Sequence, residues 1–100
     1  MDRLPVETHP DAAEEAEMAV EWYAERSIGA ALRFVDELTA AVATIAEAPF
    51  RWPSRPDSTR RVLLNKFPYA VVYKVGEAEI EIVAIAHRKR RPGYWRPRLQ

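Results

Sequence analysis

The 100-residue chain contains no cysteine, only three glycines and only two histidines, His9 and His87. Without cysteine there can be no disulfide bond and no thiolate metal ligand, and the two histidines form no spaced ligand pair for a transition metal. The isolated glycines form no phosphate-binding loop, and no serine or threonine has a base at the spacing of a hydrolase triad. We therefore expect no metal site and no cofactor.

Long apolar runs are also missing from the sequence. No stretch approaches the ~18 residues that a membrane-spanning helix requires, and the first residues, MDRLPVETHP, lack the basic-then-apolar order of a signal peptide. Together with the absence of cysteine, this predicts a soluble cytoplasmic protein with no membrane partner. The length suits one domain with one core, so we assign residues 1–100 to a single domain.

The chain has no net charge, because its 15 basic residues balance its 15 acidic residues. The two halves of the chain nevertheless differ, because residues 1–48 hold eleven acids and three bases whereas residues 49–100 hold four acids and twelve bases. Six of the cations fall within residues 88–98. Such a chain can pair its halves internally, or it can present a basic face to an anionic partner.

The first half of the sequence has helical periodicity. Residues 3–7 suit a short edge strand, where Pro5 costs least. A helix is expected to begin at Pro10, and Ser27 can cap a second helix that ends before Pro49. The second helix has an apolar repeat, formed by Ile28, Leu32, Val35, Leu38, Val42 and Ile45. The short connection predicts an antiparallel helical hairpin, followed by a stiff loop over residues 49–59 in which Phe50 and Trp52 are expected to plug the core.

The second half has the pattern of β-strands over residues 60–65, 69–75 and 79–87. The middle segment, YAVVYKV, is almost entirely β-branched or aromatic, as in a strand covered on both faces. We predict an α+β fold of order β-α-α-β-β-β. In this fold a small antiparallel sheet carries the helical hairpin on one face, and a short basic C-terminal tail follows.

The basic C-terminal end is the strongest candidate for a functional site. His87 closes the last strand, Arg88 follows it, and Arg60 and Arg61 open an earlier strand, so these side chains can line one groove across the sheet. Guanidinium groups bind phosphate and aromatic rings stack on bases, as single-stranded RNA binding requires. A basic segment with aromatic residues is equally typical of protein docking, and its aromatics can also fold back onto the sheet as core residues.

The order of the elements and the segment YAVVYKVGEAEIEIVAIAHRKRRPGYW resemble the RelE/ParE toxin superfamily of bacterial type II toxin–antitoxin systems, also called plasmid stabilisation proteins. The resemblance covers nearly the whole chain and is strongest over residues 67–95. It implies a toxin that is neutralised by a cognate antitoxin protein. It also implies one of two targets, because RelE-like members cut messenger RNA in the ribosome without a metal, whereas ParE-like members inhibit DNA gyrase.

The resemblance implies residue roles only at matching positions. The nuclease pattern places its phosphate-binding arginine at Arg88, its tyrosine at Tyr94 and a basic strand residue at Arg61. Two further cations of that pattern fall at Ala70 and Leu63 and are therefore missing.

For a ribonuclease, proton transfer would fall to His87, whose unperturbed pKa is about 6.5, or to Tyr94, whose unperturbed pKa is about 10. The predicted catalytic set is thus Arg61, His87, Arg88 and Tyr94. The predicted set for binding RNA or another target is Arg60, Lys89, Arg90, Arg91, Trp95 and Arg96. Three interpretations remain open: a metal-independent endoribonuclease, a non-enzymatic gyrase inhibitor, and a non-toxic binding module with the toxin fold.

Overall fold

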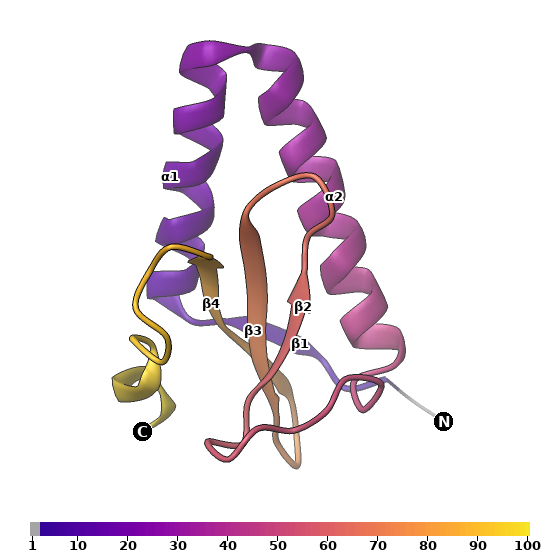
Figure 1. Cartoon of the computed structure of the whole chain (residues 1–100). Coiled ribbons are helices and arrows are strands. Elements are labelled where there is room, and N and C mark those ends of the chain that lie inside the picture. Colours follow the sequence, from indigo (N-terminus) through magenta and orange to yellow (C-terminus); the bar gives the residue numbers. More distant parts are fainter. Residues whose placement is uncertain (1–2) are drawn as a thin grey trace.

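The computed structural model describes residues 3–100, and its helices and strands follow the predicted order. The elements are β1 (Val6–Thr8), α1 (Pro10–Arg26), α2 (Ile28–Glu47), β2 (Arg60–Leu63), β3 (Tyr69–Val75), β4 (Ile80–His87) and the 3₁₀ helix η1 (Arg96–Leu99). The strands form one sheet of order β1-β4-β3-β2. The helical hairpin packs on one face of this sheet and rises beyond one end of it, while the C-terminal segment lies near β4 on the opposite side (Figure 1).

The helices begin and end as the sequence predicts. Pro10 occupies the first turn of α1, and the His9 side chain accepts a hydrogen bond from the backbone N–H of Asp11. The Ser27 hydroxyl caps α2 by accepting from the backbone N–H of Ala30. Since Ser27 also ends α1, the two helices follow each other almost directly and must pack antiparallel.

The prediction of an antiparallel sheet was wrong for β1. This strand pairs parallel to β4, with Val6 opposite Ile80, whereas β2, β3 and β4 pair antiparallel as expected. Short turns force the last three strands to alternate in direction, but the whole helical hairpin separates β1 from β2. No local signal in the sequence therefore set the direction of β1.

The main core lies between the sheet and the hairpin. Phe34 of α2 and Val71, Tyr73 and Ile80 of the sheet are fully buried, and Ala12 of α1 lets that helix approach closely. The apolar repeat of α2 faces this core only in part.

Three members of that repeat, Ile28, Leu32 and Val35, are 66%, 62% and 40% exposed, because the hairpin extends past the sheet. The loop after α2 also departs from the prediction. Phe50 is 68% exposed, while Trp52 alone packs against the core.

The face of the sheet opposite the helices, called here the far face, has a core of its own. A bulge at Val72/Tyr73 shifts the register between β3 and β4, so that the consecutive residues Val83 and Ala84 both join this second cluster. Trp95 covers the cluster and is only 3% exposed. The C-terminal segment thus folds back onto the sheet.

Candidate functional site

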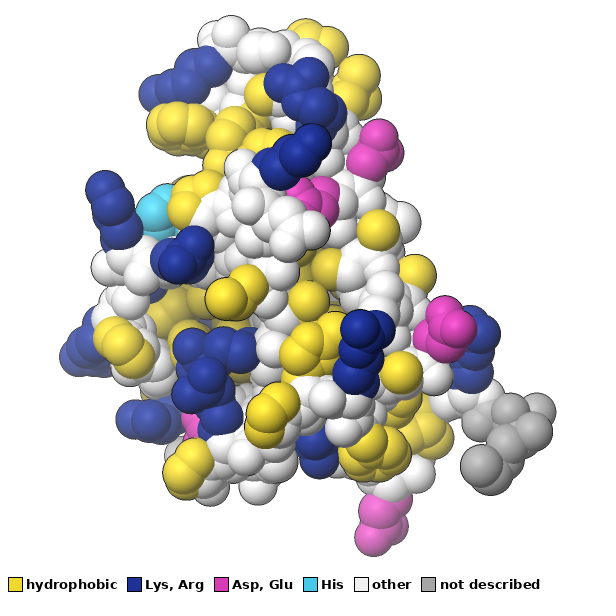
Figure 2. Space-filling model, turned by 45° about the vertical axis from the view of Figure 1, so that its right-hand side comes forward, with side chains coloured by type: hydrophobic (Ala, Val, Ile, Leu, Met, Phe, Trp, Pro, Cys, Tyr) yellow, Lys and Arg dark blue, Asp and Glu magenta, His cyan; other side chains and the backbone are white. Residues whose placement is uncertain are grey.

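The far face carries a basic groove between β2, the end of β4 and the C-terminal segment. Its hollow of about 250 Å³ has a floor of small or apolar side chains, including Ala70 and Ala86. Its arginines are Arg55, Arg61, Arg88 and Arg90, and we call this hollow the arginine groove. In the space-filling view, Lys and Arg side chains lie down the left side of the molecule and around its top, with few acidic side chains on the left (Figure 2).

All four residues proposed from the sequence for catalysis line this groove, together with two of those proposed for binding. They are Arg61, His87, Arg88, Arg90, Tyr94 and Trp95. Arg61 and the end of β4 come together because Arg61 pairs with Val72, and Val72 pairs in turn with Ala84.

Four predicted binding residues do not line the groove, and these are Arg60, Lys89, Arg91 and Arg96. The Arg60 guanidinium donates a 2.5 Å hydrogen bond to the carbonyl of Trp52, and it lies 5.2 Å from the ring centroid of Phe50. The Arg96 guanidinium lies 3.7 Å from the Asp57 carboxylate. Arg55 also lines the groove, although it was not predicted to do so. Its position in a loop gives no sequence pattern that indicates which way its side chain points.

Tyr94 has a structural partner that the sequence did not reveal. Its hydroxyl donates a 2.7 Å hydrogen bond to Glu15 Oε2 on α1. Burial raises the pKa of the Tyr94 phenol, and the bond to Glu15 raises it further. A phenol with a raised pKa that already donates to a carboxylate does not serve as a base near neutral pH.

Glu15 accepts hydrogen bonds from three residues, of which Ile85 belongs to β4 and Tyr94 and Arg98 belong to the C-terminal segment. The Arg98 guanidinium donates to both carboxylate oxygens at 3.0 and 2.9 Å, and the backbone N–H of Ile85 donates at 3.0 Å. Burial would raise the pKa of Glu15, but the bonds from Arg98, Tyr94 and Ile85 hold it below the ordinary value. We call these four residues the Glu15 latch, because they fasten the C-terminal segment to α1 and β4.

Two guanidinium groups of the groove stack on aromatic rings of the C-terminal segment. The Arg61 guanidinium carbon lies 5.3 Å from the ring centroid of Trp95, and that of Arg90 lies 3.9 Å from the ring centroid of Tyr94. Trp95 was proposed as a binding residue, but its ring is buried against Val72 and its neighbours and has no open face on which a base could stack.

His87 lies at the boundary between the arginine groove and a second hollow. Its Nδ1 accepts a 3.1 Å hydrogen bond from the backbone N–H of Lys89, and its ring packs edge-on against Tyr69 with centroids 5.0 Å apart. Nε2 therefore remains the ring nitrogen that a ligand or partner could use.

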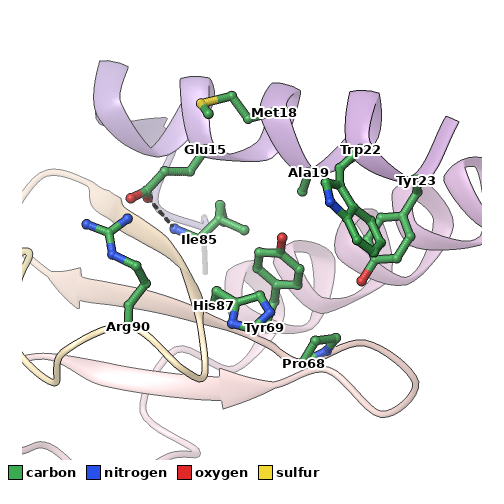
Figure 3. Close-up of a pocket in the computed structure, with 10 residues that line it drawn as sticks. All are labelled: Glu15, Met18, Ala19, Trp22, Tyr23, Pro68, Tyr69, Ile85, His87 and Arg90. Atoms are coloured by element: carbon green, nitrogen blue, oxygen red, sulfur yellow. Dashed lines mark hydrogen bonds between the residues drawn. The ribbon is translucent and has the colours of Figure 1, made fainter. Parts of the chain in front are cut away.

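The second hollow lies between α1 and the end of β4, and the sequence did not predict it (Figure 3). It has a volume of about 390 Å³ and is lined by Glu15, Met18, Ala19, Trp22, Tyr23, Pro68, Tyr69, Ile85, His87 and Arg90. We call it the α1 groove. Met18 and Trp22, one helical turn apart on α1, are 61% and 50% exposed. The sequence did contain a signal for this groove. Met18 and Trp22 are four residues apart, so they share a face of α1 next to its buried residues.

The family model described as "ParE toxin of type II toxin-antitoxin system, parDE" matches residues 6–92. The chain belongs to the ParE toxin family. The resemblance to the RelE/ParE superfamily is thereby confirmed and narrowed to its ParE branch.

One solved structure, titled "Chromosomal ParDE TA system from P. aeruginosa", has a TM-score of 0.72 and 21% sequence identity. The match covers 85% of this chain and 96% of that chain, and at this identity it shows the shared fold. No curated protein matched the ParE-family chain. Within residues 3–100, no helix is long and apolar enough to cross a membrane.

Proposed function

We propose that this ParE-family toxin arrests bacterial growth by binding DNA gyrase and that it does not cut messenger RNA. The observation that carries the proposal concerns the Tyr94 hydroxyl. It donates a hydrogen bond to Glu15 and its pKa is raised, so it does not act as a base in proton transfer. Family membership supports the same choice, because the ParE model matches residues 6–92.

The chemistry of RNA cleavage makes the argument stronger. A base must remove the proton of the 2′-hydroxyl, an acid must protonate the leaving 5′-oxygen, and cations must stabilise the charge that develops on the phosphate. The arginine groove supplies charge through its guanidinium groups, which remain protonated. With Tyr94 engaged by Glu15, the groove lining within residues 3–100 offers His87 as its one imidazole and no carboxylate, whereas cleavage needs two separate proton transfers.

The family also implies a ParD-type antitoxin as partner, and the α1 groove fits a segment of such a protein. The groove exposes Met18 and Trp22, and Arg90 lies at its end (Figure 3). An antitoxin segment that combines apolar and acidic side chains would cover the exposed apolar surface and neutralise the cations of residues 88–91.

A supercoiling assay tests the proposal. Purified toxin is incubated with DNA gyrase, ATP and relaxed plasmid, and the expected result is loss of supercoiling at micromolar toxin. Addition of the cognate antitoxin in equimolar amount is expected to restore supercoiling, which controls for non-specific inhibition by a basic protein. Undiminished supercoiling at micromolar toxin would refute the proposal.

A further inference from the structure

We infer that the exposed side of α2 is a self-association surface, on which a second copy of this chain packs antiparallel about a two-fold axis. The surface consists of Ile28, Leu32 and Val35 with the flanking residues Arg33 and Asp36, and we call it the α2 stripe. Other residues line the arginine groove and the α1 groove, so the inference does not depend on the proposed inhibition of gyrase.

Three apolar side chains of α2 lie open to solvent on one side of the helix. Ile28, Leu32 and Val35 follow each other at intervals of four and three residues, and each is at least 40% exposed. Neither the sheet nor α1 covers them, because the hairpin rises past one end of the sheet (Figure 1). Hydrophobic side chains are likewise exposed at the upper end of the space-filling view, where the hairpin lies (Figure 2). A stripe with this spacing is typical of a surface on which another helix packs.

The charges beside the stripe favour a second copy of this chain as the partner. Arg33 and Asp36 are exposed, and the helical repeat places both on the same flank of the apolar residues. Within residues 3–100, neither side chain forms an ion pair. Where two copies of one helix pack antiparallel, matching flanks meet, so Arg33 of each copy lies beside Asp36 of the other. The dimer thus gains two ion pairs that the single chain lacks.

The same arrangement brings the apolar residues together. With the two-fold axis between Leu32 and Val35, Leu32 of each copy faces Val35 of the other, and Ile28 faces Thr39. At a rise of about 1.5 Å per residue, the overlap from Ile28 to Thr39 extends over about three helical turns. One register therefore satisfies both the apolar residues and the charges, which is the property that a two-fold symmetric interface requires.

The charged flank is also accessible. Gly29 and Ala40, which lie opposite each other in this register, are small enough to let the two helices approach closely. A hollow of about 340 Å³ lies between the flank and the turn after β2, and Arg33 and Asp36 line it. One helix pair over three turns buries less than the ~1,200 Å² of a stable interface, so we expect a weak dimer with a dissociation constant of about 0.1 mM.

Sedimentation equilibrium of the purified full chain tests the inference. Between about 10 µM and about 1 mM, the weight-average mass should rise from that of one chain toward that of two. Leu32→Glu places two carboxylates at the centre of the interface and should raise the dissociation constant at least about tenfold. Phe50→Glu, the same type of change at an exposed apolar residue outside the stripe, should stay within about twofold of wild type. A wild-type chain that stays monomeric at the highest concentration, or a Leu32→Glu chain that associates like wild type, would overturn the inference.

A charge exchange tests the antiparallel pairing itself. Arg33→Glu alone and Asp36→Arg alone each place like charges across the interface, so each variant should associate about fivefold more weakly than wild type. An equimolar mixture of the two variants should associate like wild type, because the two new charges face each other and the two unchanged charges do the same. Association of the mixture no stronger than that of either variant alone would overturn the inference.

The supercoiling assay distinguishes this inference from the proposed function. Leu32→Glu should inhibit gyrase as strongly as wild type at micromolar toxin, where both proteins are monomeric. Loss of inhibition by this variant, with a wild type that stays monomeric in the centrifuge, would assign the stripe to gyrase and overturn the inference. If neither protein inhibits gyrase, the proposed function fails while sedimentation still decides the inference.

Discussion

Removing the Glu15 carboxylate should be the most damaging single change on the surface of α1. In Glu15→Ala, the Tyr94 hydroxyl and the N–H of Ile85 lose their acceptor, and the Arg98 guanidinium keeps only its bond to the carbonyl of Val83. The Glu15 and Arg98 side chains are only 15% and 14% exposed, so water replaces these bonds poorly. Each bond to a charged group contributes about 1.5–3 kcal/mol, but the bonds share one carboxylate and do not add. We expect a loss of about 3 kcal/mol in the free energy of unfolding.

Urea unfolding followed by tryptophan fluorescence measures this loss, because Trp95 is buried under the segment that the latch fastens. A loss of ~3 kcal/mol corresponds to a fall in Tm of about 12–24 °C for a chain of this size. Glu14→Ala is the matched control, since Glu14 is the exposed neighbour on the same helix and should change stability by less than about 0.5 kcal/mol. A Glu15→Ala protein as stable as the Glu14→Ala protein would refute the role of the latch.

The latch also predicts a pH dependence. The folded-state pKa of Glu15 lies below its ordinary value of 4.5. Its contribution to stability is therefore complete above that value and is lost as the pH falls through the folded-state pKa. Wild type should lose more stability than Glu15→Ala on acidification below pH 4.5, and parallel pH profiles for the two proteins would contradict this.

Three further changes probe the arginine cluster, the core and the β2–β3 turn. Replacement of Arg88, Arg90 and Arg91 by Gln should abolish growth arrest and change stability by less than about 1 kcal/mol, because exposed cations contribute little to folding; full toxicity in an induced-expression assay would contradict the functional role. Trp95→Ala should cost about 3–5 kcal/mol in urea unfolding, because the ring is buried in the far-face cluster; a loss below 1 kcal/mol would argue against that packing. Glu37→Ala should cost about 1 kcal/mol, because its carboxylate accepts from two backbone N–H groups of the turn after β2; unchanged thermal unfolding would contradict this.

The fold was predictable wherever local patterns determine it. The helix start at Pro10, the cap at Ser27, the break at Pro49 and the β-branched strands all act through neighbouring residues, and the structure confirms them. The direction of β1 and the exposure of Leu32 depend on contacts between distant segments. Periodicity reports which residues share a face, but not whether the sheet reaches far enough to cover that face.

The candidate site was predictable in location more than in detail. The order of strands brought Arg61 and Arg88 to one groove, as the sequence suggested. The partner of Tyr94 could not be foreseen, because Glu15 lies 79 residues away and belongs to a helix rich in similar glutamates. The sequence does not determine whether Trp95 is buried, and the structure packs its ring into the cluster that contains Val83 and Ala84.

The proposed function requires that this ParE-family chain bind its target without cutting RNA. The most direct measurement adds purified toxin to a translating extract and maps the ends of the messenger RNA, with the Tyr94→Phe variant in parallel. We expect uncut messenger with both proteins, at a toxin concentration that abolishes supercoiling by gyrase. Codon-positioned cuts made by the wild-type protein and lost with Tyr94→Phe would contradict it.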